Sequence, residues 1–406
     1  MRAVADADSV RRQNRGLVMS ALRWHGPMSR TQLASITGLS NASLTAISTE
    51  LLNQGILLEG PPPAKAGQRG RPAVELAFRR DAVHVAMVEL DVTRVRFSLA
   101  NYAGVLVDRV ETPVTPGMFA QTPAAPFLAQ WIRQLKERNP AEGRSLAALA
   151  ISAQGMLDRQ AGSLSWSPIP DFAGKPIVSP LSTEFGIPVT LQKRGVLLAR
   201  GARLLYPQFG DKPIAALFLG STVAMGINLP GQPDSGATEF GHMNHIPDGA
   251  RCRCGQRGCI EAYAADYGVL RSAYGVPDQT PPASTVPAAA YQKLVSSALG
   301  GNREAGHAFR QAGRAIGFGL ARLLTILPPA HVIITGPGAA AYALMEGEIR
   351  AALDNSLVSR VAGPPDLTVH HDEREPIYQG MLAEALVAQD AMLAASAAGE
   401  QAAPPR

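Results

Sequence analysis

The chain has 406 residues, of which 46% are hydrophobic and 17% are charged. This length is enough for two or three domains with their own cores, and the composition excludes a mostly disordered chain. No apolar run reaches the roughly 18 residues of a membrane-spanning helix, and the first ten residues lack the apolar centre of a secretory signal. The sequence therefore predicts a cytoplasmic protein without a membrane partner.

Positive charge is concentrated at the N-terminal end. Residues 1–80 contain 11 Lys and Arg against 5 Asp and Glu, a net charge of +6, and the other residues contain 27 against 28, a net charge of −1. This asymmetry indicates an anionic partner for the first fifth of the chain. A basic surface that merely faces solvent is the alternative.

Three short helices are predicted within the first 53 residues. Residues 14–26 carry apolar side chains at helical spacing. Ser29, followed three residues later by Gln32, is a capping box that predicts the start of a second helix. After the tight turn at residues 38–40, a third helix is predicted over residues 41–53. Its outward face is expected to be short and polar, with Asn41, Ser43, Thr45, Ser48 and Thr49.

Two strands of a hairpin are predicted next, over residues 56–58 and 74–78. The loop between them, GPPPAKAGQRGRP, carries Lys65, Arg69 and Arg71. Two helices joined by a tight turn and followed by a hairpin form a winged helix-turn-helix, which is predicted over residues 1–80. A small helical domain that binds protein or oligomerises is the alternative.

The winged helix-turn-helix suits DNA binding. Asn, Ser and Thr on a narrow helix can bond base edges in the major groove, arginines can contact phosphates, and an arginine on a thin loop can enter the minor groove. The candidate DNA-binding residues are Arg30, Asn41, Ser43, Thr45, Ser48, Arg69 and Arg71.

From about residue 82, buried-strand patterns alternate with helical ones, which predicts an α/β body with mostly parallel strands. We expect a first lobe over residues 81–195, completed by a C-terminal helix over residues 380–395. A second lobe is expected over residues 196–379, and a disordered tail over residues 396–406.

All three cysteines, Cys252, Cys254 and Cys259, lie in one eight-residue window. Three thiols cannot form a closed disulfide set, and a tight cluster in a cytoplasmic protein indicates a metal. Thiolates favour Zn²⁺, and one histidine would close a tetrahedral structural site. His242 and His245 are both candidates for the fourth ligand. Three reduced, packed cysteines are the alternative.

The pattern Glu239-Phe-Gly-His242, followed by CxCGxxGCxE from Cys252 to Glu261, resembles the double signature of the ROK family of repressors, open reading frames and kinases. The resemblance runs from about residue 14 to 395. The segments SRTQLA, TGLS and GRPA are similar to the winged-helix module of the family's repressors. The resemblance implies a two-lobed body of the sugar-kinase and actin-like ATPase type. It also implies that His242 and the cysteines bind zinc, and that Glu239, His242 and Glu261 contact a sugar.

The sequence departs from the kinases of the family at three elements. Arg194 stands where the kinases have the aspartate that acts as general base, and Lys193 where they have an asparagine. A guanidinium cannot accept the proton, and losing a general base costs about 10²–10⁴ in rate. Residues 88–93 lack the glycines of the first phosphate loop, and residues 220–224 keep only the first glycine of the second. The sequence therefore predicts no enzymatic activity.

The predicted function is a transcriptional regulator of sugar-related genes, a repressor, that binds operator DNA as a homodimer or dimer of dimers. Its ligand would contact Glu239, His242, Glu261, Lys193 and Arg194. The two cations could suit an acidic sugar, or form salt bridges within an empty pocket. A diverged sugar kinase, or a regulator whose body binds no ligand and only dimerises, are the alternatives.

Overall fold

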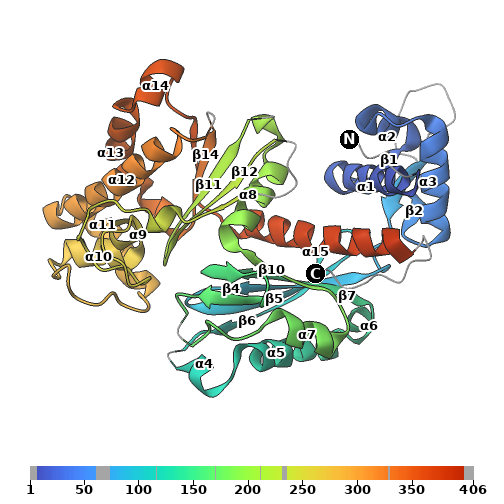
Figure 1. The fold of residues 1–406 in the computed structure, drawn as a ribbon, viewed down its shortest axis with the longest axis horizontal. Coiled ribbons are helices and arrows are strands. Elements are labelled where there is room, and N and C mark those ends of the chain that lie inside the picture. The colour runs from blue at the N-terminus through green and yellow to red at the C-terminus, as the bar shows by residue number, and fades with distance from the viewer. Residues whose placement is uncertain are drawn as a thin grey trace.

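The computed structural model describes residues 7–60, 74–115, 117–169, 171–210, 212–230, 236–327 and 330–396. The chain forms an N-terminal module and two α/β lobes, and the last helix, α15 (Arg374–Ser396), runs from the region between the lobes to the module (Figure 1). Among the described residues, no helix combines the length and the apolar character that crossing a membrane requires.

The N-terminal module is a winged helix-turn-helix, as predicted. Ser29 caps the second helix, and the reciprocal contact of the Gln32 side chain with the Ser29 backbone completes the capping box. The three strands pair in the order β1-β3-β2. Arg69 and Arg71 lie outside the described residues. The elements are α1 (Ala7–His25), β1 (Met28–Ser29), α2 (Arg30–Thr37), α3 (Asn41–Asn53), β2 (Leu57–Gly60) and β3 (Glu75–Phe78).

The first lobe is built on a five-stranded sheet in the order β10-β7-β4-β5-β6. One face of this sheet packs on α5 and α7, and the other packs on α15. Its elements are β4 (His84–Leu90), β5 (Arg94–Asn101), β6 (Leu106–Pro113), α4 (Met118–Gln121), α5 (Ala124–Arg138), α6 (Pro140–Arg144), β7 (Leu146–Ala153), β8 (Met156–Asp158), β9 (Ser163–Trp166), α7 (Val178–Phe185) and β10 (Val189–Lys193).

The second lobe has a sheet of the same size in the order β13-β12-β11-β14-β15. Helix α8 packs on β11 and β12 of this sheet, and α12 packs on α13. Its elements are α8 (Arg194–Leu205), η1 (Pro207–Phe209), β11 (Ile214–Leu219), β12 (Val223–Asn228), β13 (Gly236–Thr238), η2 (Phe240–His242), α9 (Glu261–Ala264), α10 (Asp266–Ala273), α11 (Ala288–Leu299), α12 (Arg303–Leu323), β14 (His331–Thr335), η3 (Pro337–Ala341), α13 (Tyr342–Asp354), α14 (Leu357–Ala362) and β15 (Leu367–His370).

The prediction of mostly parallel strands is wrong, because each large sheet is mixed. In the first lobe β4, β5 and β6 pair antiparallel, whereas β7 pairs parallel with both β4 and β10. The second lobe repeats this arrangement: β11, β12 and β13 are antiparallel, and β14 pairs parallel with both β11 and β15. Short turns between consecutive strands can join only antiparallel pairs, whereas the longer helical connections return the chain for parallel pairing.

Helices α8 and α15 pack against each other between the two sheets, and glycines allow their close approach. A Cβ at Gly201 would lie 1.8 Å from the carbonyl oxygen of Pro376, and a Cβ at Gly380 would lie 1.9 Å from that of Leu197. Since α15 also packs on β4 and β7, this pair of helices connects the two lobes.

We expect Gly201→Ala to destabilise the protein by about 1–3 kcal/mol, because the added methyl group forces the two helix backbones apart. Gly16→Ala in α1 is the matched control, since a Cβ there meets nothing within 4 Å. The control is expected to be neutral or to stabilise by about 0.5–1 kcal/mol, because alanine favours a helix over glycine. Urea unfolding of both variants measures the difference, and equal stabilities would contradict a tight α8–α15 contact.

Candidate functional site

The exposed face of α3 is narrow and made of small side chains. Asn41, Ala42, Thr45, Ala46 and Thr49 are exposed, whereas Leu44, Ile47 and Leu51 face the core of the module. Ser43 is half-buried, and its hydroxyl lies 2.9 Å from that of the capping residue Ser40. A helix with such a face fits the major groove of DNA, where short polar side chains reach base edges.

Ser48 does not lie on this face, and the prediction of its outward position is wrong. Its side chain is fully buried, and its hydroxyl accepts a hydrogen bond of 2.8 Å from Nε of Arg30. The reason is helical spacing, because residue 48 lies one turn after Leu44 on the side that packs against α2. Arg30, which also pairs with Glu59 at 3.1 Å, is partly exposed beside α3.

The four predicted metal ligands lie together. The ligand atoms of His242, Cys252, Cys254 and Cys259 are all within 4.8 Å of one another. Nδ1 of His242 lies 3.7 Å from Sγ of Cys252, and the sulfur atoms of Cys254 and Cys259 are 3.7 Å apart. A tetrahedral ion with bonds of about 2.3 Å to sulfur separates its ligand atoms by about 3.8 Å. The donor set and its spacing therefore fit Zn²⁺.

His245, the competing fourth ligand, is not part of this cluster. Its ring contacts Tyr263 and Phe318 instead. The loop that carries the cysteines turns sharply at Gly258, whose φ is +78° and whose added Cβ would lie 1.7 Å from the carbonyl oxygen of Ile246. Only glycine fits this position, which brings Cys259 back beside Cys254.

All five predicted ligand-binding residues line a single pocket between the lobes. The pocket has a volume of about 40 Å³, which is room for roughly three water molecules. Lys193 and Glu239 form an ion pair with each other at its rim. The residues concerned are Lys193, Arg194, Glu239, His242 and Glu261.

Glu261 lies between this pocket and the metal ligands. It is 1% exposed, and its carboxylate accepts hydrogen bonds from the backbone N–H of Val223 at 3.1 Å and from the Tyr267 hydroxyl at 3.3 Å. Burial raises the pKa of Glu261 to about 7. One of its oxygens also lies 3.7 Å from Sγ of Cys252, so this side chain is placed both to contact a ligand and to support the metal loop.

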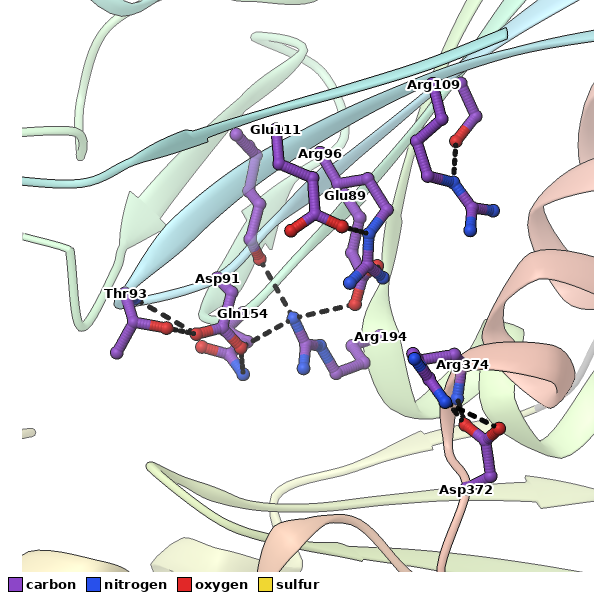
Figure 2. Close-up of polar contacts among 12 residues, drawn as sticks. Glu89, Asp91, Thr93, Arg96, Arg109, Glu111, Gln154, Arg194, Asp372 and Arg374 are labelled. Carbon is purple, nitrogen blue, oxygen red and sulfur yellow. Dashed lines mark hydrogen bonds and ion pairs between the residues drawn. The ribbon is translucent and has the colours of Figure 1, made fainter. Parts of the chain in front are cut away.

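Arg194 forms ion pairs with two carboxylates of the first lobe. Its guanidinium lies 2.9 Å from Asp91 and 3.3 Å from Glu89, and it donates a hydrogen bond to the carbonyl of Leu90 (Figure 2). It also lies over the ring of Phe218, with 5.0 Å to the centroid. Burial opposes the charged form of Asp91, but Arg194 and hydrogen bonds from Thr93 outweigh this effect and lower the pKa of Asp91.

The ion pairs continue through the sheet to its edge strand. Arg96 pairs with Glu89 and with Glu111, both at 2.6 Å (Figure 2). The sequence left two interpretations open for Lys193 and Arg194: contact with an acidic ligand, or salt bridges within the protein. In the described structure both side chains form salt bridges within the protein. Both cations are therefore already paired with carboxylates of the protein, although Nε of Arg194 is buried without a hydrogen-bond partner among the described residues.

Gln154 and Thr222 are pocket residues that the sequence analysis missed. Both are 5% exposed, and the buried Oε1 and Oγ1 atoms have no hydrogen-bond partner among the described residues. The amide nitrogen of Gln154 donates to Asp91 at 3.4 Å, which leaves its oxygen as an acceptor. Buried polar atoms without partners indicate a missing water or ligand. The position of Gln154 directly after a strand was the available signal.

A model of the ROK family matches residues 85–389. The chain belongs to the ROK family. It is 27% identical to the DNA-binding transcriptional repressor Mlc of Escherichia coli K12 over 271 residues, which are 66% of each chain, slightly less than two thirds of Mlc. It is 20% identical to the xylose repressor of Bacillus subtilis 168, over 90% of this chain and 92% of the repressor.

Solved structures of the ROK family share the fold. A ROK transcriptional regulator described as a homologue of E. coli Mlc matches 95% of this chain and 98% of its own, with a TM-score of 0.74 and 21% identity. A ROK glucokinase from Streptomyces griseus, in complex with glucose and AMPPNP, matches 73% of this chain and 98% of its own, with a TM-score of 0.57 and 20% identity. The larger coverage of the first confirms the fold class, a winged helix-turn-helix joined to a two-lobed sugar-kinase body.

Proposed function

We propose that this ROK protein is a transcriptional repressor of sugar-related genes, which binds operator DNA and responds to a sugar or sugar derivative. The observation that carries the proposal is the combination of two features in this chain. It has a helix α3 that exposes small side chains. It also has a ROK body in which Arg194, which the resemblance puts at the general-base position of the kinases, is buried and ion-paired. The likeness to Mlc and to the xylose repressor, which are named as repressors, supports it.

Operator recognition is proposed for α3 and its surroundings. Asn41 and Thr45 would contact base edges, with Ser43 beside them, and Arg30 would contact a phosphate. Arg69 is proposed to contact a phosphate as well, and Arg71 is proposed to enter the minor groove. A protein that reads two half-sites is at least a dimer, so we expect a homodimer or a dimer of dimers, located in the cytoplasm.

Asn41→Ala is expected to weaken operator binding by about 1–3 kcal/mol, roughly 5- to 150-fold, because a good base contact contributes that much discrimination. The operator is first selected from a pool of random duplexes with the full-length protein, and affinity is then measured by fluorescence anisotropy. Asn53→Ala is the matched control, since Asn53 is exposed at the other end of α3. If both variants bind like the parent, α3 does not read the operator through Asn41.

Sugar phosphorylation, the activity of other ROK proteins, is not proposed for this chain. The guanidinium of Arg194 stays protonated and cannot take a proton from a sugar hydroxyl. Clear ATP turnover with any member of a hexose panel would overturn this part of the proposal.

The ligand site is proposed in the pocket lined by Glu239, His242 and Glu261, with Gln154 and Thr222 as additional contacts. Hydroxyl groups of a sugar can donate to the carboxylates and to the amide oxygen of Gln154. Since the pocket is small and Lys193 pairs with Glu239 at its rim, ligand entry requires the lobes or this ion pair to move. A thermal-shift screen of neutral and acidic sugars tests for binding.

Zinc is proposed as a structural ion held by His242, Cys252, Cys254 and Cys259. A closed set of four protein ligands supplies folding energy rather than catalysis. The ion would fix the loop that ends at Glu261, so it would support the ligand pocket indirectly.

A continuous set of contacts joins the ligand pocket to the DNA-binding module. Lys193 and Arg194 stand at the start of α8, and α8 packs on α15. Near the far end of α15, Asp390 accepts hydrogen bonds from Arg23 of α1 at 3.0 Å and from the hydroxyl of Tyr102 at 2.5 Å. A movement of α8 on ligand binding would therefore shift α15 and the module together. The ligand must bind the two arrangements with different affinity for this to regulate DNA binding.

A further inference from the structure

A second, larger cavity lies between the lobes, next to the pocket described above. Its volume is about 520 Å³, within the range of roughly 300–1,000 Å³ that small-molecule sites occupy. Arg194 lines both this cavity and the smaller pocket, so its side chain forms part of the wall between them. We call the larger space the inter-lobe cavity.

The inter-lobe cavity has an apolar wall and an acidic edge. Its apolar wall is formed by Phe218, Tyr291, Val295 and Pro337 of the second lobe. The carboxylates that line the same space are Asp91, Asp266 and Glu373. A ligand that fits must therefore offer an apolar body and tolerate negative charge at one side.

The charges around the cavity disfavour a nucleotide. Of the two lining guanidiniums, Arg194 is already paired with Asp91 and Glu89, and Arg94 is exposed. The turn over residues 90–93 holds a carboxylate side chain, that of Asp91, instead of a glycine backbone that could wrap a phosphate. Bringing a polyphosphate beside three carboxylates would add repulsion, and Arg194, the buried guanidinium of this lining, already pairs with Asp91 and Glu89.

Asp266, at the start of α10, is a carboxylate of this lining with a distant ion-pair partner. It is largely buried, and its ion-pair partner among the described residues, Arg253, lies 3.8 Å away. Burial raises the pKa of Asp266 to about 6 despite Arg253 and a backbone hydrogen bond from Tyr267. Tyr291 lines the same cavity and is near enough for the charge of Asp266 to act on its phenol. A cation placed here would gain both a carboxylate partner and an aromatic neighbour.

We propose that the inter-lobe cavity is a second ligand site, which binds a small organic cation with a protonated amine near Asp266 and an apolar or aromatic body against Tyr291 and Val295. The site is distinct from the proposed sugar pocket, although Arg194 lines both. Asp91 of the cavity is also hydrogen-bonded to Gln154 of the sugar pocket. Because of these shared contacts, a ligand in one site alters the affinity of the other site for its ligand. Such coupling is reciprocal.

Isothermal titration of the full-length protein, without DNA or sugar, tests this site with probes that share one skeleton. The probes are 2-phenylethylamine, the neutral 2-phenylethanol and the anionic 3-phenylpropionate, with ATP and Mg²⁺ as the nucleotide. We expect the amine to bind and each of the other probes to bind at least about tenfold more weakly, because only the amine can donate a charge-assisted hydrogen bond to the carboxylate of Asp266. Asp266→Asn should weaken amine binding by about tenfold or more.

Asp354→Asn is the matched control, since Asp354 lies at the end of α13, outside the cavity lining. Val295→Trp fills the cavity and keeps the test valid if Asp266→Asn fails to fold; it should abolish amine binding. Equal binding of amine and alcohol, binding of ATP, binding of no probe, or amine binding that survives Val295→Trp would each overturn the proposal. None of these outcomes bears on operator binding, so failure here is distinguishable from failure of the proposed repressor function.

Discussion

Arg194→Met is expected to lower the free energy of unfolding by about 3–5 kcal/mol, because removing one partner leaves buried carboxylates without their cation. Arg194 is 2% exposed and its partners Asp91 and Glu89 are each 13% exposed in their side chains. Because the apolar methionine keeps most of the contact with Phe218, the loss of unfolding free energy measures the contribution of the charge. Chemical unfolding at pH 7 measures it.

Arg314→Met is the matched control for this variant. Arg314 forms a similar pair with Glu348 at 2.8 Å, but its side chain is 58% exposed. Exposed ion pairs contribute about 0–1 kcal/mol, so the control should unfold almost like the parent. Equal losses in both variants would show that burial does not set the contribution of Arg194.

We also expect the loss of stability in Arg194→Met to depend on pH. Asp91 has a pKa below its ordinary value of 3.8 in the folded protein, so its interactions stabilise the fold above that value and are lost as the pH falls through the folded pKa. In Arg194→Met the unpaired carboxylates take up protons more readily. The stability difference between parent and variant should therefore shrink as the pH is lowered from 7 toward 4. A difference that stays constant over this range would contradict the ion-pair explanation.

His242→Ala is expected to abolish stoichiometric zinc binding and to lower the melting temperature by about 10 °C. Structural zinc sites contribute folding energy directly, and a loss of about 3–5 kcal/mol moves the melting temperature of a lobe of this size by about that amount. Cys259→Ser should behave in the same way, because Cys259 is buried within the same cluster. Metal content per chain and thermal unfolding are the measurements.

His245→Ala separates this prediction from a general effect of losing a histidine beside the loop. His245 contacts Tyr263 and Phe318 and stands outside the ligand cluster, so this variant should retain one zinc ion per chain. Zinc retained by His242→Ala and lost by His245→Ala would reverse the ligand assignment. No zinc in the parent protein, after purification without chelators, would leave three packed thiols as the correct interpretation.

Local features were predictable because they depend on neighbours in sequence. The capping box of Ser29 and Gln32 fixes the start of α2, and α3 spans residues 41–53 as its apolar spacing predicts. The cysteine spacing and His242 similarly indicated the metal cluster. Ser48 is an exception: its polarity predicts an exposed position, but its place one turn from Leu44 puts it on the buried face.

Features that depend on distant parts of the chain were not predictable in the same way. Arg194 was identified as a departure from the kinases, but its pairing with Asp91 joins residues more than 100 positions apart, and no pattern in the sequence specifies it. The unpartnered oxygens of Gln154 and Thr222 become visible only when β7 and β12 meet at the pocket. The mixture of parallel and antiparallel pairs in the two sheets likewise depends on which connections between strands are short. The hydrophobic patterns of the strands alone do not specify these pairings.

The most direct test of the repressor assignment is the operator affinity of the full-length protein with and without each member of a panel of neutral, acidic and phosphorylated sugars. The operator comes from the selection described above, and affinity is measured at one fixed salt concentration because phosphate contacts depend on salt. We predict nanomolar-range specific binding that one sugar weakens by about 5- to 150-fold, the usual size of allosteric coupling. A protein that selects no duplex, or whose operator affinity is the same with every sugar, would contradict a sugar-responsive repressor.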